Sequence, residues 1–161
     1  MPDSIYGLGA STYVGGTTGG DVIVALTALS QLAGGSGSDN MHGSSESDVL
    51  TGGKGNDFMF GGGGSDTFLW SPSDLSSDGT TYDKVFDFDG GGVASGDNLV
   101  FYGFGADSTF TVTGMQSIGD GTVIYKYTLT DSTTSYSQTI YISSKTGLAL
   151  TTDDYHFYGT V

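Results

Sequence analysis

Residues 34–69 read GGSGSDNMH, GSSESDVLT, GGKGNDFMF and GGGGSDTFL, which are four consecutive units of nine residues. Glycine opens each unit, aspartate is the sixth residue and an apolar residue is the eighth. This pattern predicts a coil in which the first six residues of a unit turn and the last three form a short strand with its apolar side chain inside. The aspartates are Asp39, Asp48, Asp57 and Asp66, and the apolar residues are Met41, Leu50, Met59 and Phe68.

The nine-residue register extends beyond these four units in both directions. Residues 16–24 keep Asp21 at the sixth position, whereas residues 25–33 have Ser30 there and residues 7–15 keep only the opening glycine and the apolar position. A further unit at 78–86 contains Asp83 and lies one residue out of step, after a loop around Pro72. We therefore predict a right-handed parallel β-roll over residues 7–86.

The segment after residue 86 has a different pattern. Runs rich in β-branched and aromatic residues are separated by glycine, aspartate and serine turns, which predicts strands joined by loops. The runs are 110–113, 122–129, 138–142 and 155–158. We expect an all-β protein in which residues 87–161 form a strand-rich cap that continues the core of the roll.

The repeated aspartates predict bound calcium. This cation takes roughly six to eight oxygen ligands, which exceeds what one such turn offers, so two turns must share an ion. If each unit is half a coil, units that are eighteen residues apart stack on the same side. The predicted ions, about three to four, lie between Asp21 and Asp39, Asp39 and Asp57, Asp48 and Asp66, and Asp66 and Asp83; the gap between Ser30 and Asp48 should be weak or empty.

The charge of the chain agrees with cation binding. It contains 18 acidic residues and four lysines, with a net charge of −14. Such a chain is a poor partner for nucleic acid or for an anionic membrane, and no stretch is apolar enough to span a bilayer. Stacked aspartates without cations would repel one another, so we expect the repeats to be disordered without calcium and to fold when it binds.

The repeat resembles the RTX (repeats in toxin, hemolysin-type) family, most firmly over residues 34–69. The resemblance implies that carbonyl groups of the turn glycines join the aspartates as ligands, here Gly35, Gly37, Gly53, Gly55, Gly62 and Gly64. Ser44 and Glu46 replace two such glycines in unit 43–51. The family also implies a non-catalytic C-terminal module of a larger bacterial protein, exported by a type I secretion apparatus through an uncleaved C-terminal signal and folded outside the cell.

Two further functions are open from the sequence. A catalytic role is disfavoured, because the chain has no cysteine or arginine and its histidines, His42 and His156, suit surface or packing positions better than catalysis. The alternative is a polysaccharide-binding accessory module of an extracellular carbohydrate-active enzyme, such as an alginate epimerase. The ligand would be a neutral or calcium-bridged polysaccharide, stacked on aromatic residues that otherwise close the core: Trp70, Tyr102, Tyr125, Tyr127, Tyr136, Tyr141, Tyr155 and Tyr158.

Overall fold

The computed structural model describes residues 4–7, 13–26, 29–90, 96–118 and 122–159. Parts of the predicted units at 7–15 and 25–33, and of the glycine-rich stretch after Asp87, lie outside these ranges. The described residues form strands, turns and loops, and contain no helix that could cross a membrane. The protein is all-β, as the sequence predicts.

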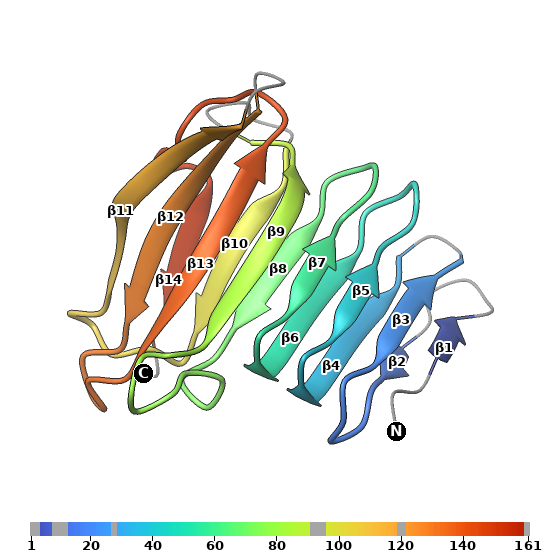
Figure 1. Cartoon of the computed structure of the whole chain (residues 1–161), viewed down its shortest axis with the longest axis horizontal. Coiled ribbons are helices and arrows are strands. Elements are labelled where there is room, and N and C mark those ends of the chain that lie inside the picture. The colour runs from blue at the N-terminus through green and yellow to red at the C-terminus, as the bar shows by residue number, and fades with distance from the viewer. Residues whose placement is uncertain (1–3, 8–12, 27–28, 91–95, 119–121, 160–161) are drawn as a thin grey trace.

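The strands form two sheets that lie face to face along an elongated stack (Figure 1). The eight-stranded sheet has the order β1-β3-β5-β7-β9-β13-β12-β11, and the six-stranded sheet has the order β14-β10-β8-β6-β4-β2. The first contains β1 (Ser4–Gly7), β3 (Val22–Ala25), β5 (Asn40–His42), β7 (Phe58–Phe60), β9 (Tyr82–Phe88), β13 (Ser137–Ser144), β12 (Thr122–Thr130) and β11 (Thr109–Ile118). The second contains β14 (Tyr155–Tyr158), β10 (Asn98–Tyr102), β8 (Thr67–Trp70), β6 (Val49–Gly55), β4 (Gln31–Gly37) and β2 (Tyr13–Gly15).

Successive repeat units alternate between the two sheets, so each pair of units makes one coil. Strands β3, β5 and β7 pair in parallel with Ile23 beside Met41 and Met41 beside Met59. On the other sheet, Leu32 pairs with Leu50 and Leu50 with Phe68. These partners are eighteen residues apart, which confirms the predicted stacking.

The apolar residue at the eighth position of each unit points into the space between the sheets. Met41, Leu50, Met59 and Phe68 are fully buried. Side chains alternate between the two faces of a strand, so one apolar residue per short strand is enough to build a continuous core. Burying an aliphatic or aromatic side chain of this size contributes about 1.5–3 kcal/mol, and the stack repeats that contribution at each half coil.

The predicted cap is continuous with the roll. Strand β13 pairs in parallel with β9, and β12 and β11 follow as antiparallel strands. Strands β10 and β14 meanwhile continue the parallel order of the smaller sheet. The expected division at residues 86 and 87 falls inside β9, so both sheets run across it.

Aromatic residues fill the core at the cap end of the stack. Phe101 lies at its centre, with ring centroids 4.8 Å from Phe157, 4.9 Å from Phe110 and 5.8 Å from Trp70. These rings are tilted against one another, an arrangement that aromatic pairs favour over flat sandwiches. The core at the cap end is therefore built mainly from aromatic rings, whereas in the roll Met41, Leu50 and Met59 contribute non-aromatic side chains beside Phe68.

Candidate metal centre

The sixth-position aspartates form two rows, one along each side of the roll. In the first row, the carboxylate Oδ1 of Asp39 accepts a hydrogen bond of 2.8 Å from the backbone N–H of Asp21, and Oδ1 of Asp57 accepts one of 2.9 Å from that of Asp39. In the second row, Asp48 receives the N–H of Ser30 at 2.7 Å and Asp66 receives that of Asp48 at 2.8 Å. The predicted neighbours therefore meet in both rows.

The placement of Asp83 corrects one prediction. We expected Asp83 to stack on Asp66, but its Oδ1 accepts the N–H of Asp57 at 2.9 Å, and β9 pairs with β7. The residue that follows Asp66 is Asp97, whose Oδ1 accepts its N–H at 2.9 Å. The loop at 71–81 forms no half coil of its own, so the chain passes from β8 on the smaller sheet to β9 on the larger one, and the next aspartate joins the first row.

The second carboxylate oxygen, Oδ2, separates the aspartates into two groups. Oδ2 of Asp21 accepts the N–H of Thr17 at 2.6 Å, and Oδ2 of Asp48 accepts that of Ser44 at 2.6 Å. The Oδ2 atoms of Asp39, Asp57 and Asp66 are buried and have no hydrogen-bond partner. A buried carboxylate oxygen without a protein partner is unfavourable, so these three oxygens are the strongest structural signal for a cation site.

The glycine pattern explains this difference between turns. In the three units with unpartnered oxygens, the second and fourth residues are glycines with positive φ: Gly35 (103°), Gly37 (125°), Gly53 (93°), Gly55 (135°), Gly62 (98°) and Gly64 (97°). Ser44 and Glu46 occupy these positions in unit 43–51 and do not have positive φ. The turn N–H of Ser44 then reaches Asp48, whereas no such bond forms in the glycine turns.

The glycine turns also bring carbonyl oxygens into the gaps between stacked coils. A β-carbon at Gly53 would meet the carbonyl oxygen of Gly35, and one at Gly62 would meet that of Ser44. At the first position, a β-carbon at Gly34 or Gly52 would overlap Oδ2 of the aspartate in the same turn. Glycine is therefore required where the carboxylate and the main-chain oxygens come close together.

These oxygens fit a hard divalent cation. Calcium prefers carboxylate and carbonyl oxygens and tolerates irregular geometry. In the described residues, no three side chains of histidine, cysteine, aspartate or glutamate gather around one point. The carboxylates of one or two aspartates would therefore supply part of the coordination of the cation, and main-chain carbonyl oxygens of the turns would supply the rest.

The electrostatics of the rows also favour a cation. Burial raises the pKa of Asp57 to about 7, and repulsion from Asp39 adds to the effect. Burial likewise raises the pKa of Asp66 to about 7, with Asp97 and Asp48 contributing repulsion. The pKa of Asp39 is raised mainly by burial too. The ionised rows are thus under electrostatic strain that a bound cation would relieve.

Asp83 ends its row in a different way. Its Oδ2 accepts hydrogen bonds from the Trp70 indole N–H, at 2.6 Å, and from the side-chain amide of Gln138. Burial raises the pKa of Asp83 well above its ordinary value, with repulsion from Asp57 as the next cause. Both oxygens of Asp83 already have protein partners, which makes it a weaker candidate ligand than Asp39 or Asp57.

Sequence reasoning missed Asp97 as a member of the second row. The signal was present, because Asp97 is followed two residues later by the buried Leu99, as in the repeat units. The carboxylate of Asp87 accepts the N–H groups of Gly61, at 2.8 Å, and Gly62, at 2.9 Å. An insertion before Asp97 breaks the nine-residue count, which hid this unit from a search by period.

The eight aromatic residues proposed as a stacking face do not share one surface. Trp70 and Tyr127 are buried in the core, and Tyr125 and Tyr155 pack against it. Tyr102 and Tyr158 are exposed on the smaller sheet, whereas Tyr141 lies on the larger one. Core packing therefore accounts for half of this set.

The comparisons with known proteins agree with the repeat and the fold. Residues 33–68 match, in four copies, the family described as RTX calcium-binding nonapeptide repeat, so this segment is an RTX repeat region. A search among curated proteins finds no match.

Among the solved structures that resemble the chain are two from the mannuronan C5-epimerase of Azotobacter vinelandii. The solution structure of its AlgE6R2 subunit is 26% identical, with a TM-score of 0.55, and the match covers 100% of this chain and 95% of that one. The AlgE6R3 subunit is 25% identical, with a TM-score of 0.44 and coverage of 91% and 78%. The likeness to the AlgE6R2 subunit supports the β-roll fold.

Proposed function

We propose that this protein is a calcium-binding module that folds when calcium binds and that stabilises a larger secreted protein. The observation that carries the proposal is the set of buried Oδ2 atoms of Asp39, Asp57 and Asp66, which have no partner in the fold. We assign about three ions to the gaps between Asp21 and Asp39, between Asp39 and Asp57, and between Asp48 and Asp66. Carbonyl groups of Gly35, Gly37, Gly53, Gly55, Gly62 and Gly64 complete the ligands.

Folding and binding are coupled in this proposal. In the unfolded chain the aspartates are solvated and far apart, whereas in the roll they are buried and stacked. The short strands offer limited apolar burial to offset the loss of conformational entropy. Calcium supplies the opposite charge and binds only the folded arrangement, so its binding free energy becomes folding free energy.

The cellular role follows from this coupling together with the RTX repeats. Cytosol low in calcium keeps the repeats unfolded for export by a type I secretion apparatus, and extracellular calcium folds them. The protein acts outside a bacterial cell as a non-catalytic part of a larger protein, an enzyme or an adhesin. The likeness to a subunit of a larger enzyme, the mannuronan C5-epimerase, supports this assignment.

Counting bound ions in two variants tests the ligand scheme. Asp39 lies between two proposed gaps, whereas Asp21 borders one. We expect Asp39→Ala to lose about two of about three ions and Asp21→Ala to lose about one. Calcium content is measured by isothermal titration calorimetry or by equilibrium dialysis with atomic emission, on variants whose circular dichroism shows the folded roll. Equal stoichiometry in the two variants would contradict shared ions.

A second candidate function is that of a polysaccharide-binding accessory module. The mannuronan C5-epimerase, to which the AlgE6R2 subunit belongs, acts on a polysaccharide, and that subunit shares the fold of this chain. A groove on the outer face of the larger sheet is the feature of this chain that favours the second function.

A further inference from the structure

The outer face of the larger sheet carries a continuous aromatic surface. The rings of His42 and Phe60 stack at 4.6 Å with an angle of 7°, and those of Phe60 and Phe86 stack with the same values. These residues lie on β5, β7 and β9, which are adjacent strands (Figure 1). The three rings therefore form a ladder of rings stacked face to face across the sheet, on the side away from the core.

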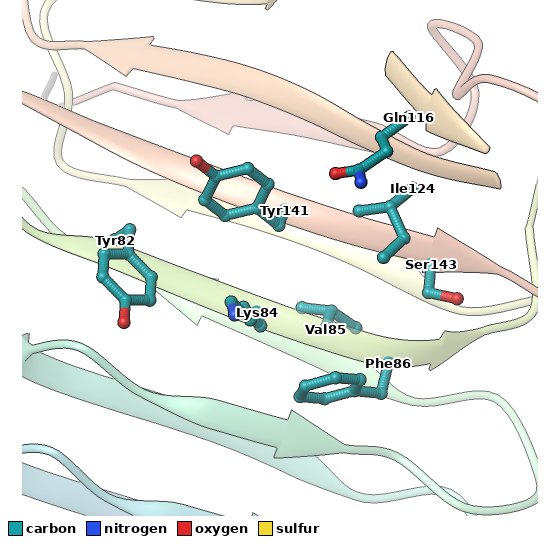
Figure 2. A pocket seen from close by; sticks show the side chains of 8 residues that line it. All are labelled: Tyr82, Lys84, Val85, Phe86, Gln116, Ile124, Tyr141 and Ser143. Atoms are coloured by element: carbon teal, nitrogen blue, oxygen red, sulfur yellow. The ribbon is translucent and has the colours of Figure 1, made fainter. Parts of the chain in front are cut away.

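Beside this ladder lies a groove of about 320 Å³. Tyr82, Lys84 and Phe86 come from β9, and Tyr141 and Ser143 come from the neighbouring β13 (Figure 2). Gln116 and Ile124, from β11 and β12, line the opposite side. The groove adjoins a second hollow of about 400 Å³, which shares Phe86 and Ser143 and contains Asp87.

The chemistry of the groove is aromatic and polar, with one cation. Its lining offers two tyrosine rings, one phenylalanine ring, a serine hydroxyl, a glutamine amide and the ammonium group of Lys84, and it contains no acid. Rings beside hydroxyl and amide groups are the features by which proteins bind molecules with both apolar faces and polar edges. A pyranose ring is such a molecule, because its C–H groups form its faces and its hydroxyls form its rim.

The charges around the groove favour a neutral ligand over an acidic one. The ammonium group of Lys84 lies 5.4 Å from the ring centroids of Phe58 and Tyr82 and 5.9 Å from that of Tyr141, where it is held by cation–π contacts. Asp87 stands in the adjoining hollow, and the chain as a whole has a net charge of −14. A polymer with a carboxylate on each sugar would meet repulsion that a neutral polymer does not.

We propose that the groove formed by Tyr82, Phe86 and Tyr141 binds a neutral polysaccharide by stacking sugar rings on aromatic side chains. This inference deepens the second candidate function and needs calcium only to keep the roll folded. The ladder of His42, Phe60 and Phe86 adjoins the groove and holds the Phe86 ring in place by stacking it on Phe60. Gln116 and Ser143 are placed to hydrogen-bond the hydroxyl rim of the sugar.

The test uses the whole calcium-loaded protein and three hexasaccharides of equal length: cellohexaose, mannohexaose and hexamannuronate. We expect at least one neutral hexasaccharide to give saturable shifts in the amide NMR spectrum, centred on β9 and β13, and a heat of binding by calorimetry. Phe86→Ala and Tyr82→Ala should each weaken that affinity by about tenfold. Tyr102→Ala is the matched control, because Tyr102 is 63% exposed on the outer face of the other sheet.

Several outcomes would overturn the proposal. These are binding of hexamannuronate alone, no binding of either neutral hexasaccharide, equal binding by wild type and both groove variants, or an equal loss in Tyr102→Ala. Self-association that sedimentation velocity detects and that Phe86→Ala abolishes would show that a second copy covers the face. Circular dichroism in calcium is recorded for each protein, so a protein that folds with calcium and binds no glycan contradicts the groove and leaves the calcium function standing.

Discussion

Asp57→Asn is expected to change the calcium-free and calcium-bound protein in opposite directions. Without calcium, the substitution removes a buried charge whose pKa is raised to about 7, while an amide oxygen can still accept the N–H of Asp39. At pH 8 the Asp57 carboxyl is ionised and solvated in the unfolded chain, whereas in the folded protein the same charge is buried. The charge therefore lowers the free energy of unfolding of the calcium-free protein. The variant should therefore gain on the order of 1–3 kcal/mol in the calcium-free state.

In saturating calcium the same variant loses a carboxylate ligand of the ion proposed between Asp39 and Asp57. We expect its free energy of unfolding to fall by about 2–4 kcal/mol relative to wild type. Urea unfolding at pH 8 in saturating calcium measures this loss. The gain in the calcium-free state is measured in chelator at pH 8 as the concentration of trimethylamine N-oxide that induces folding, which should be lower for the variant than for wild type. The calcium dependence of stability should be much smaller in the variant than in wild type.

Asp48→Asn is the matched control for this prediction. Both oxygens of Asp48 accept backbone N–H groups, from Ser30 at 2.7 Å and Ser44 at 2.6 Å. An asparagine can replace only one of these acceptors, so this variant should be less stable than wild type even in chelator. If Asp57→Asn were destabilised to the same extent as Asp48→Asn in chelator, the unpartnered oxygen of Asp57 would not be a source of strain.

The second large effect is expected for Gly55→Ala. Gly55 has a φ of 135°, which side-chain-bearing residues rarely adopt, and a β-carbon there would overlap the carbonyl oxygen of Gly37 in the neighbouring coil. Backbone strain and this steric overlap should together lower the free energy of unfolding by about 2–4 kcal/mol. Urea unfolding in saturating calcium gives the value, and calorimetry should show weaker calcium binding, because Gly37 and Gly55 are proposed ligands.

Glu46→Ala provides the comparison at the same repeat position. Glu46 is the fourth residue of its unit, is exposed and does not have a positive φ. Removing its side chain should change the free energy of unfolding by no more than about 0.5 kcal/mol. Equal stability losses in Gly55→Ala and Glu46→Ala would show that the glycine conformation has no special role in the turn.

Most of the fold could be predicted from the sequence, because two features of the repeat, its apolar position and its length, each specify part of the structure. The apolar eighth position predicts the core, and Met41 and Met59 are indeed buried and paired. The length of two units predicts the spacing between paired strands. The runs at 110–113, 122–129, 138–142 and 155–158 also correspond to strands, at β11, β12, β13 and β14.

The order of strands after residue 70 could not be predicted in the same way. A repeat fixes the neighbour of each strand only while its period is unbroken, and the loop at 71–81 breaks it. From the sequence, Asp83 could then belong to either row of aspartates. In the structure β9 pairs with β7, which places Asp83 in the row of Asp57. The pairing of β13 with β9 depends on tertiary packing of Ile140 and Ile142, which a local pattern does not encode.

The sequence also could not show which aspartates have a hydrogen-bond partner for the second carboxylate oxygen, Oδ2. All sixth-position aspartates look equivalent in the repeat. The structure separates Asp39, Asp57 and Asp66 from Asp48 because the glycines at the second and fourth positions change the path of the turn. Ser44 and Glu46, which replace glycines, indicated a different turn. They did not indicate that the backbone N–H of Ser44 would donate a hydrogen bond to the carboxylate of Asp48.

The most direct test of calcium-coupled folding is a calcium titration of the metal-free protein, followed by far-UV circular dichroism at pH 7.5 to 8. We predict little β signal in chelator, a cooperative gain of β signal on addition of calcium, reversal by chelator, and no equivalent gain with magnesium, which demands a stricter octahedral geometry. A protein that is already fully folded in chelator and does not respond to calcium would contradict the account.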